Sequence, residues 1–299
     1  MSQIFDALHQ SQAEREGGGS RHFSAAKELL KAVERTSDGP AALLEPPAQL
    51  ARRAPLREFP TAEVQLSEHS KMVCLAESES FAAEKFRFLA TRLRHMQQKR
   101  SLKRFVITSS VSGEGKSMVA ANLACALGRG RQEVLLVEGD LRRPSLAQQL
   151  GLNALPGLSQ ALQGETDPLG NVCRLQGSGF CVLLAGNAHS NPLEFMQVER
   201  LSQLLDHIET GFDWVVIDSP PVLPLADTSI WMRLADAVLL VTRPGVTAQN
   251  HLQRTLEAIE RQKLLGAVVN ASTEATSNDY YYHYAARPGG SQAPSLVVR

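Results

Sequence analysis

The sequence lacks a net charge and any apolar run long enough to cross a membrane. Among its 299 residues, 31 Lys and Arg balance 31 Asp and Glu, so no overall field draws the chain to nucleic acid or to an acidic membrane. The longest apolar runs, such as residues 237–241, are far shorter than the roughly 20 residues that a transmembrane helix needs. No charged-then-apolar signal segment stands at the N-terminus. These absences predict a cytoplasmic protein that does not bind nucleic acid.

Cysteine is sparse and unpaired in the sequence. Cys74, Cys125, Cys173 and Cys181 form no CxxC pair and do not cluster with histidine, which indicates neither a zinc site nor a disulfide framework. This usage fits a reducing compartment. The hydrophobic content of 43% is typical of a globular protein with a sizeable core.

The apolar periodicity divides the chain into three parts. Residues 1–74 contain a GGGS run and little sustained periodicity, which predicts a flexible extension. The first dozen residues favour a short helix that is either frayed or a docking peptide. Residues 75–275 are expected to form the folded domain, which opens with an amphipathic helix from about Ser80. Residues 276–299 are polar, aromatic and Gly/Pro-bearing, and are expected to form a flexible tail.

Short apolar and β-branched runs alternate with helical stretches in this domain. The runs begin at residues 105, 134, 181, 214, 237 and 266. Continuous apolar strands that alternate with helices predict a mostly parallel sheet with helices on both faces. Together with the phosphate-binding loop after the first run, this pattern predicts an α/β fold of the P-loop NTPase type.

The phosphate-binding loop lies in the segment TSSVSGEGKSMVAANL. A strand, a glycine-bearing loop and a helix N-terminus follow one another here, which aims backbone N–H groups and the positive helix end at phosphate. Lys116 is expected to reach the β- and γ-phosphate oxygens of ATP, and Ser117 to supply a hydroxyl to Mg²⁺. Ser110 stands where the usual pattern has its first glycine. The residues expected to bind ATP in this segment are Ser112, Gly113, Glu114, Gly115, Lys116, Ser117 and Met118.

Three acids follow later strands and complete the predicted site. Glu138 and Asp140 come just beyond the second strand, and Asp218 ends a later one. The carboxyl ends of parallel strands share one edge of the sheet with the loop. Asp218 is the candidate to hold Mg²⁺ or its waters, with Glu138 as a second group at the metal. Asp140 is the candidate to accept the proton of an attacking hydroxyl, and these three acids with Lys116 form the expected catalytic set.

Two further polar positions each have two interpretations. Arg142 or Arg143 either neutralises charge on a transferring phosphoryl group or lies at a surface or interface. Asn270 ends the last predicted strand, where it either hydrogen-bonds a nucleotide base or caps the strand. The residue types alone favour neither interpretation.

All the tyrosines of the chain lie together near its C-terminus. Tyr280, Tyr281, Tyr282 and Tyr284 stand in the segment DYYYHY. A tail of this kind can bring a phenol oxygen in line with a γ-phosphate, which makes the cluster the candidate phosphoacceptor. The alternative is a Tyr-rich interaction patch. Phosphorylation adds about −1.5 to −2 charge per residue, so it would release the tail from an acidic site and switch assembly off.

These motifs together resemble the bacterial tyrosine kinases of capsule and exopolysaccharide systems over residues 75–285. SGEGKS is similar to the family's Walker A motif, VEGDLRRP to its second acidic motif, and FDWVVIDSPPVLPLAD, with Asp227, to its Walker B motif. The resemblance implies an ATP- and Mg²⁺-dependent tyrosine autokinase that regulates polysaccharide synthesis or export. It also implies a homo-oligomer and a separate membrane-anchored activator of the chain-length-determinant type, which would hold the kinase at the inner membrane.

The chain departs from the family's pattern at two motifs. Glu138 stands where the first aspartate of the second acidic motif is usual. In the helix before the first long strand, Glu84 and Arg87 match the family's ExxRxxR oligomerisation motif, whereas Ala90 replaces the second arginine and Arg92 lies nearby.

Two other functions are compatible with these residues. One is a nucleotide switch without kinase activity, similar to the septum-positioning and plasmid-partitioning ATPases, which carry a signature lysine where this chain has Val111. The other is an inactive adaptor that binds ATP and a polysaccharide-export partner without transferring phosphate. Glu138 in place of aspartate keeps the adaptor in consideration.

Overall fold

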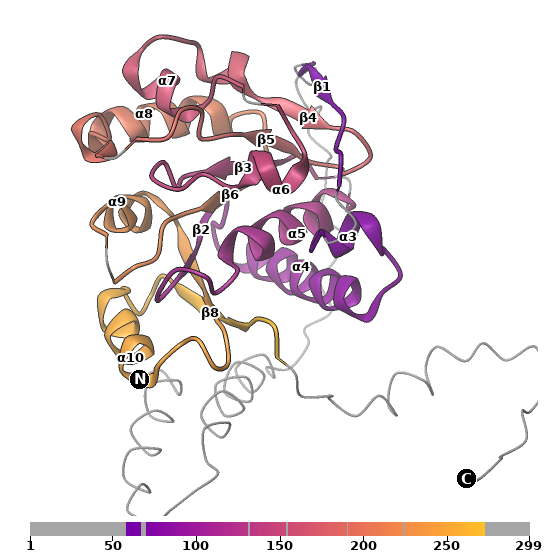
Figure 1. Cartoon of the computed structure of the whole chain (residues 1–299), viewed down its shortest axis with the longest axis vertical. Helices are drawn as coiled ribbons and strands as arrows, with labels where there is room; N and C mark the ends of the chain where they lie inside the picture. Colours follow the sequence, from indigo (N-terminus) through magenta and orange to yellow (C-terminus); the bar gives the residue numbers. More distant parts are fainter. Residues whose placement is uncertain are drawn as a thin grey trace, which may run out of the picture.

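A computed structural model describes residues 58–66, 70–130, 132–153, 155–189, 191–223 and 225–272. These residues form a single sheet with helices on both faces (Figure 1). Helices α3 to α6 pack on one face of the sheet, and helices α7 to α10 pack on the other. The predicted α/β architecture is confirmed.

The sheet has eight strands within the described residues, in the order β1-β4-β5-β3-β6-β2-β7-β8. Every neighbouring pair runs parallel except β4 and β5, so the expectation of a mostly parallel sheet is correct. The strands are β1 (Thr61–Ala62), β2 (Arg104–Ser109), β3 (Val134–Glu138), β4 (Cys173–Leu175), β5 (Cys181–Leu183), β6 (Trp214–Asp218), β7 (Ala237–Thr242) and β8 (Leu264–Val269).

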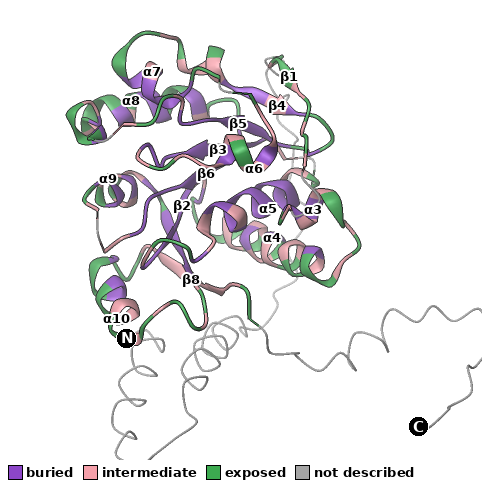
Figure 2. Ribbon diagram, in the orientation of Figure 1, coloured by how far each residue is buried: buried purple, intermediate pink, exposed green. Residues whose placement is uncertain are grey.

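The side chains of the central strands supply the core on both faces. In β6, Trp214 and Val216 pack on the side of α5, whereas Val215 and Ile217 pack on the side of α8 and α9, because successive residues of a strand point to opposite faces. All of these side chains are buried, so the strands form the buried layer of Figure 2. The continuous apolar runs of the sequence therefore reflect burial on two faces rather than one.

Helix α5 (Lys116–Gly128) leads from the phosphate-binding loop directly into the core. Every residue from Val119 to Leu127 is buried, because its mostly small and apolar side chains let it pack between the sheet and α4 (Phe81–Lys99). Helix α4 begins where predicted, with the Ser80 hydroxyl accepting the N–H of Ala83 at 3.2 Å.

The remaining helices are shorter. They are α3 (Val73–Ala76), α6 (Leu146–Leu150), α7 (Leu158–Gln163), α8 (Val198–Glu209), α9 (Asp227–Leu234) and α10 (Gln249–Ala258), with 3₁₀ turns at η1 (Pro168–Asn171) and η2 (Pro192–Glu194). Of the helices in the described ranges, none combines the length and the apolarity of a membrane-spanning segment.

The folded domain begins earlier than the expected boundary at residue 75. Val64 packs against the core, and the buried Asn122 of α5 accepts the N–H of Cys74 at 3.0 Å and donates to the carbonyl of Lys71 at 2.9 Å. Composition misplaced the boundary because this segment joins the core through a few isolated contacts rather than a periodic face. The N-terminal helix predicted in the first dozen residues lies outside the described residues.

Strands β1 and β4 were not predicted. They contain two and three residues, too few to show a period in the sequence. Their pairing adds an edge to the sheet, where Arg174 N–H donates to the carbonyl of Pro60 at 2.8 Å and Gln176 N–H to that of Ala62 at 2.9 Å.

We expect Phe59→Ala to destabilise the domain. Phe59 is half-buried and stacks on Phe212 with the ring centroids 5.6 Å apart, so its loss should lower the free energy of unfolding by about 1–3 kcal/mol. Phe88→Ala, at a side chain that is 55% exposed, is the control and should change it by less than about 0.5 kcal/mol. Urea titration followed by tryptophan fluorescence measures both values. Equal effects would place Phe59 outside the folded domain.

Candidate functional site

The loop between β2 and α5 has the conformation that its glycines allow. Gly113 and Gly115 have φ angles of +87° and +88°, in the left-handed region that residues with a Cβ rarely adopt. Gly115 also lacks room for a side chain, because a Cβ there would lie 2.1 Å from the Nδ2 of Asn270. Both glycines are therefore needed for the shape of this loop.

The backbone N–H groups of the loop form a cradle for an anion. Within the described part of the chain, the N–H groups of Ser112, Gly113, Glu114 and Gly115 donate to no protein acceptor. The first N–H groups of α5 follow directly, together with the positive end of its dipole. Unpaired donors and a helix N-terminus are the groups that bind phosphate in proteins. The loop residues therefore fit a nucleotide phosphate chain.

Lys116 and Asp140 form an ion pair in the site. Nζ of Lys116 lies 3.1 Å from Oδ2 of Asp140, and the two side chains are only 13% and 7% exposed. The other oxygen of Asp140 accepts the N–H of Arg143 at 3.1 Å. Reduced solvent screening makes such a pair stronger than one on the surface. The predicted phosphate lysine and the predicted base are thus brought together, and Asp140 competes with phosphate for the lysine.

Asp218 is a buried carboxylate to which the described residues donate no well-formed hydrogen bond. Its place is fixed by the backbone, since it is opposite Ile107 in β2 and Glu138 in β3. Burial raises the pKa of Asp218 to about 7, against the opposing effect of the nearby Lys116 charge. A buried, unsatisfied acid is costly, and a hydrated divalent cation would satisfy it. The side chain predicted to serve Mg²⁺ fits that role.

Glu138, at the end of β3, is hydrogen-bonded to the main chain through both of its carboxylate oxygens. Its Oε1 accepts the N–H groups of Ser145 and Leu146, each at 2.6 Å, and its Oε2 accepts the N–H of Ala185 at 3.0 Å. Burial raises the pKa of Glu138, while these hydrogen bonds oppose the shift. Because main-chain donors engage both oxygens, Glu138 holds the start of α6 against β5. Its roles at the metal and in catalysis stay predictions.

Arg142 is held by a buried acid. Its Nε and Nη2 lie 2.6 Å and 3.1 Å from the two carboxylate oxygens of Asp227, which begins α9 and is 1% exposed. This bidentate pair fastens the segment after β3 to α9.

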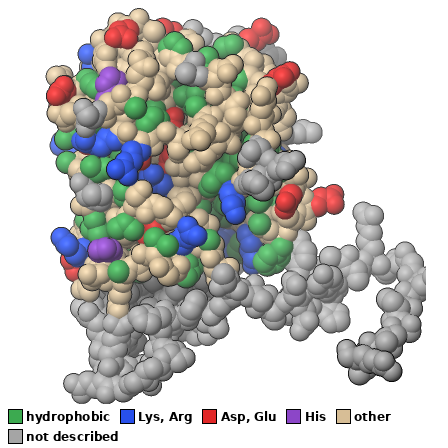
Figure 3. Space-filling view, viewed as in Figure 1, with side chains coloured by type: hydrophobic (Ala, Val, Ile, Leu, Met, Phe, Trp, Pro, Cys, Tyr) green, Lys and Arg blue, Asp and Glu red, His purple; other side chains and the backbone are tan. Residues whose placement is uncertain are grey.

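On the face of the molecule in Figure 3, Lys and Arg side chains gather across the middle, level with β2 and α5 in Figure 1, although the chain has no net charge.

Asn270 reaches the phosphate-binding loop from the end of β8. Its Nδ2 donates to the carbonyl of Glu114 at 2.9 Å, and its N–H donates to the carbonyl of Thr242 at 2.8 Å. The side chain thus supports the loop backbone. A contact with the nucleotide base stays a prediction.

A turn after β7 also contacts the loop and was not predicted from the sequence. Nη1 of Arg243 donates to the carbonyl of Gly113 at 3.2 Å, and the Thr247 hydroxyl donates to the Glu114 carboxylate. The only sequence signal was a Pro-Gly turn, RPGVT, directly after a predicted strand. Such a turn lies at the same sheet edge as the loop, because the strands are parallel.

Trp231 of α9 is a second contact that the sequence did not indicate. Its Nε1 donates to the carbonyl of Gly139 at 3.1 Å, and a Cβ on Gly139 would lie 2.8 Å from the indole ring. Gly139 N–H in turn donates to the carbonyl of Asp218 at 2.7 Å. Trp231 therefore holds the strand ends that carry Asp140 and Asp218.

The residues expected to serve oligomerisation pair with each other in α4. Nε of Arg87 donates to Glu84 at 2.6 Å, and its Nη1 donates to the carbonyl of Ser78 at 2.6 Å. Both side chains are partly exposed, whereas Ala90, at the position of the family's second arginine, is fully buried in the core. Contact with a second copy stays a prediction for Glu84 and Arg87.

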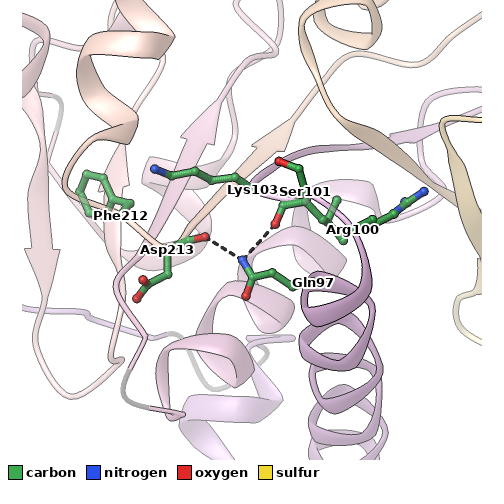
Figure 4. Close-up of a pocket in the computed structure, with 7 residues that line it drawn as sticks. Gln97, Arg100, Ser101, Lys103, Phe212 and Asp213 are labelled. Atoms are coloured by element: carbon green, nitrogen blue, oxygen red, sulfur yellow. Dashed lines mark hydrogen bonds between the residues drawn. The ribbon is translucent and has the colours of Figure 1, made fainter. Parts of the chain in front are cut away.

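A shallow depression of about 290 Å³ lies away from this site. Lys103 and Asp213 in its wall precede β2 and β6, so it lies at the amino ends of the strands, opposite the phosphate-binding loop. Figure 4 shows the Gln97 amide in it, which donates to the carbonyls of Leu102 at 2.9 Å and Asp213 at 3.1 Å.

The predicted phosphoacceptors Tyr280, Tyr281, Tyr282 and Tyr284 lie outside the described residues.

Comparison with known proteins places this geometry in a family. The family model described as the NUBPL iron-transfer P-loop NTPase, of the ParA group, matches residues 101–293. Tyrosine-protein kinase YwqD of Bacillus subtilis (strain 168) is 30% identical over 214 residues, which cover 71% of this chain and 90% of the relative.

The putative tyrosine-protein kinase EpsB of Ralstonia solanacearum is 34% identical over 208 residues, which cover 69% of this chain but only 27% of that longer relative. Among solved structures, the kinase domain of the Escherichia coli tyrosine kinase ETK superposes with a TM-score of 0.63 at 26% identity, and the match covers 69% of this chain and 83% of that one. The fold, the phosphate-binding loop with its two strand-end aspartates, and these matches agree: the chain belongs to the bacterial tyrosine kinases, a family built on the P-loop NTPase fold.

Proposed function

We propose that this chain is an ATP- and Mg²⁺-dependent autokinase that transfers the γ-phosphoryl group to Tyr280, Tyr281, Tyr282 and Tyr284. The observation that carries the proposal is the buried Lys116–Asp140 pair beside the unsatisfied Asp218 at the N–H cradle. Nucleotide binding needs the cradle, and a metal ion needs Asp218. Transfer to a phenol also needs a group to accept its proton, and Asp140 is the acid available for it.

Binding of ATP would redistribute these contacts. The unpaired N–H groups of the loop and the start of α5 would receive the phosphate oxygens, and Lys116 would turn from Asp140 to the β- and γ-phosphates. Asp140 would then be released from its cationic partner, and its Oδ2 would be free to accept a hydrogen bond from the attacking hydroxyl. Mg²⁺, held through Asp218 and the Ser117 hydroxyl, would neutralise charge on the β- and γ-oxygens.

The transfer itself moves one phosphoryl group and one proton. The tyrosine oxygen forms a bond to the γ-phosphorus while the bond from that phosphorus to the β,γ-bridging oxygen breaks, and ADP leaves. The phenol proton passes to Asp140. Positioning and charge stabilisation supply most of the acceleration in this class of reaction, which is why two buried carboxylates and one lysine suffice.

The biological setting follows from the family. We propose that the chain acts in capsule or exopolysaccharide synthesis or export, docks on a separate membrane-anchored activator of the chain-length-determinant type, and assembles into homo-oligomers through Glu84 and Arg87. Residues 276–299 would supply the substrate tail to the same or a neighbouring copy. Phosphorylated tyrosines carry about −1.5 to −2 charge each, and repulsion from Asp140 and Asp218 would release the tail and disassemble the oligomer.

Lys116→Met should abolish tyrosine labelling. Purified full-length chain with a candidate activator tail, labelled ATP and Mg²⁺ is expected to carry label on Tyr280 to Tyr284, and the variant none, because the lysine that holds the β- and γ-phosphates is gone. Lys85→Met, on the surface of α4 beside Phe81, is the control and should label normally. Peptide mapping of the label identifies which residues are phosphorylated. Label confined to Ser or Thr would contradict the tyrosine-kinase proposal. ATP binding and hydrolysis without any label on the protein would contradict it as well.

Asp140→Asn should separate ATP binding from phosphoryl transfer, because it is expected to impair only the second. Removal of the carboxylate frees Lys116 for the phosphates, so ATP affinity should stay the same or rise about two- to threefold, whereas labelling should fall by about 100-fold or more, as for loss of a general base. Calorimetry of ATP binding and single-turnover labelling give the two numbers. A parallel loss of both would assign Asp140 to nucleotide binding alone.

Asp218→Asn should stabilise the nucleotide-free protein in a pH-dependent way. The Asp218 pKa is about 7 in the fold against 3.8 for an exposed aspartate, so the folded state retains a proton that the unfolded chain releases, and wild-type stability falls as pH rises through this window. At about 1.4 kcal/mol per pKa unit, the gain should reach about 4 kcal/mol at pH 8 and be clearly smaller at pH 5. Denaturant titrations measure it. An equal gain at both values would contradict the shifted titration.

A further inference from the structure

An acidic side chain is buried inside the phosphate-binding loop. Glu114 has no exposed surface, one of its carboxylate oxygens accepts the N–H of Val111 at 2.9 Å, and the other accepts the hydroxyl of Thr247. Thr247 Oγ1 in turn accepts the N–H of Arg243 at 2.8 Å. A chain of hydrogen bonds thus runs from the loop to the turn after β7.

The charge of Glu114 works against the ligand of this loop. A carboxylate beside a phosphate chain repels it, and the repulsion is strong where solvent screening is low. A buried carboxylate also carries a desolvation cost unless its oxygens are hydrogen-bonded. Its two hydrogen bonds offset that cost: the bond from Val111 joins the first half of the loop to its second half, and the bond from Thr247 joins the loop to the turn after β7. The contribution of Glu114 is therefore to the shape of the loop and not to the attraction of the nucleotide.

We propose that Glu114 is a positioning residue for the nucleotide and that it acts jointly with Thr247. By holding Val111 N–H, Glu114 closes the loop on itself, which leaves the N–H groups of Ser112 to Gly115 aimed into the cradle. Thr247 anchors the closed loop to the turn after β7, where its Oγ1 accepts the N–H of Arg243. This inference rests on nucleotide binding at the loop, which is part of the proposed function, and does not depend on the identity of the phosphate acceptor.

Two other contacts support the same segment. Nη1 of Arg243 donates to the carbonyl of Gly113 at 3.2 Å, and Nδ2 of Asn270 donates to the carbonyl of Glu114 at 2.9 Å. The carbonyls that flank the unpaired N–H groups are thus fixed from outside the loop. Donors held in place before binding lose less freedom when the ligand arrives, which increases affinity.

The experiment measures Mg²⁺–ADP binding by calorimetry on the full chain, because ADP needs no acceptor and no transfer. If wild-type protein fails to bind ADP, the proposed function fails first and independently. Glu114→Ala and Thr247→Val should each weaken ADP binding by about tenfold or more, through the unsatisfied donor or acceptor that each leaves. The double variant should be no weaker than Glu114→Ala, because the two side chains act as one unit.

Conservative variants separate the positioning effect of Glu114 from the effect of its charge and from any loss of folding. Glu114→Gln is neutral but can still accept from Val111 and donate to Thr247, and Thr247→Ser retains the hydroxyl, so both should bind ADP within about threefold of wild type. Glu257→Ala, at an exposed acid on α10, is the matched control and should bind like wild type.

Tighter or unchanged ADP binding by Glu114→Ala would overturn the proposal, because it would show that the charge of Glu114 is its main effect. Additive losses in the double variant would also overturn it, as would failure of Thr247→Ser to bind better than Thr247→Val. If Glu114→Ala proves unfolded by circular dichroism, the Thr247→Val and Thr247→Ser pair decides alone.

Discussion

The pairing of β6 with both β2 and β3 fixes the site on which the rest of the structure depends. Asp218 is opposite Ile107 on one side and Glu138 on the other, so one set of backbone hydrogen bonds places three strand ends at a common edge. The phosphate-binding loop begins immediately after β2, and Asp140 follows β3 by two residues. A slip of one residue in either pairing would turn Asp218 to the opposite face of the sheet. The apolar side chains that fill both faces prevent such a slip.

The three acids at this edge differ in role because their surroundings differ. Main-chain N–H groups occupy both oxygens of Glu138 and lock α6 to β5. Asp140 is paired with Lys116, and Asp218 is buried with no well-formed hydrogen bond from the described residues. The hydrogen bonds of Glu138 therefore stabilise the scaffold. The ion pair of Asp140 holds Lys116 near the place where phosphate would bind, and the buried Asp218 is suited to bind a cation. Residue type alone does not distinguish these environments.

Much of the support for the phosphate site comes from outside its motif. The turn after β7, the end of β8 and Trp231 of α9 each hydrogen-bond to a segment that carries a functional group. The same fold serves relatives with different activities, as the ParA match and the tyrosine-kinase relatives illustrate, so fold by itself does not set the chemistry. In this chain the chemistry depends on which side chains these supports present to the cradle.

The sequence by itself determined the fold class, the central strands, the start of α4 and the position of the phosphate-binding loop. These are local properties: a two-sided apolar strand, an N-cap serine and a glycine-rich loop before a helix are each written in consecutive residues. Only the tertiary structure decided the place of β1 and β4, the pairing of Arg142 with Asp227, the structural position of Glu138 and the support of Glu114 by Thr247. Each of these depends on groups far apart in the chain that meet only when the sheet forms, and hydrogen-bond partners at such distances leave no pattern in a single sequence.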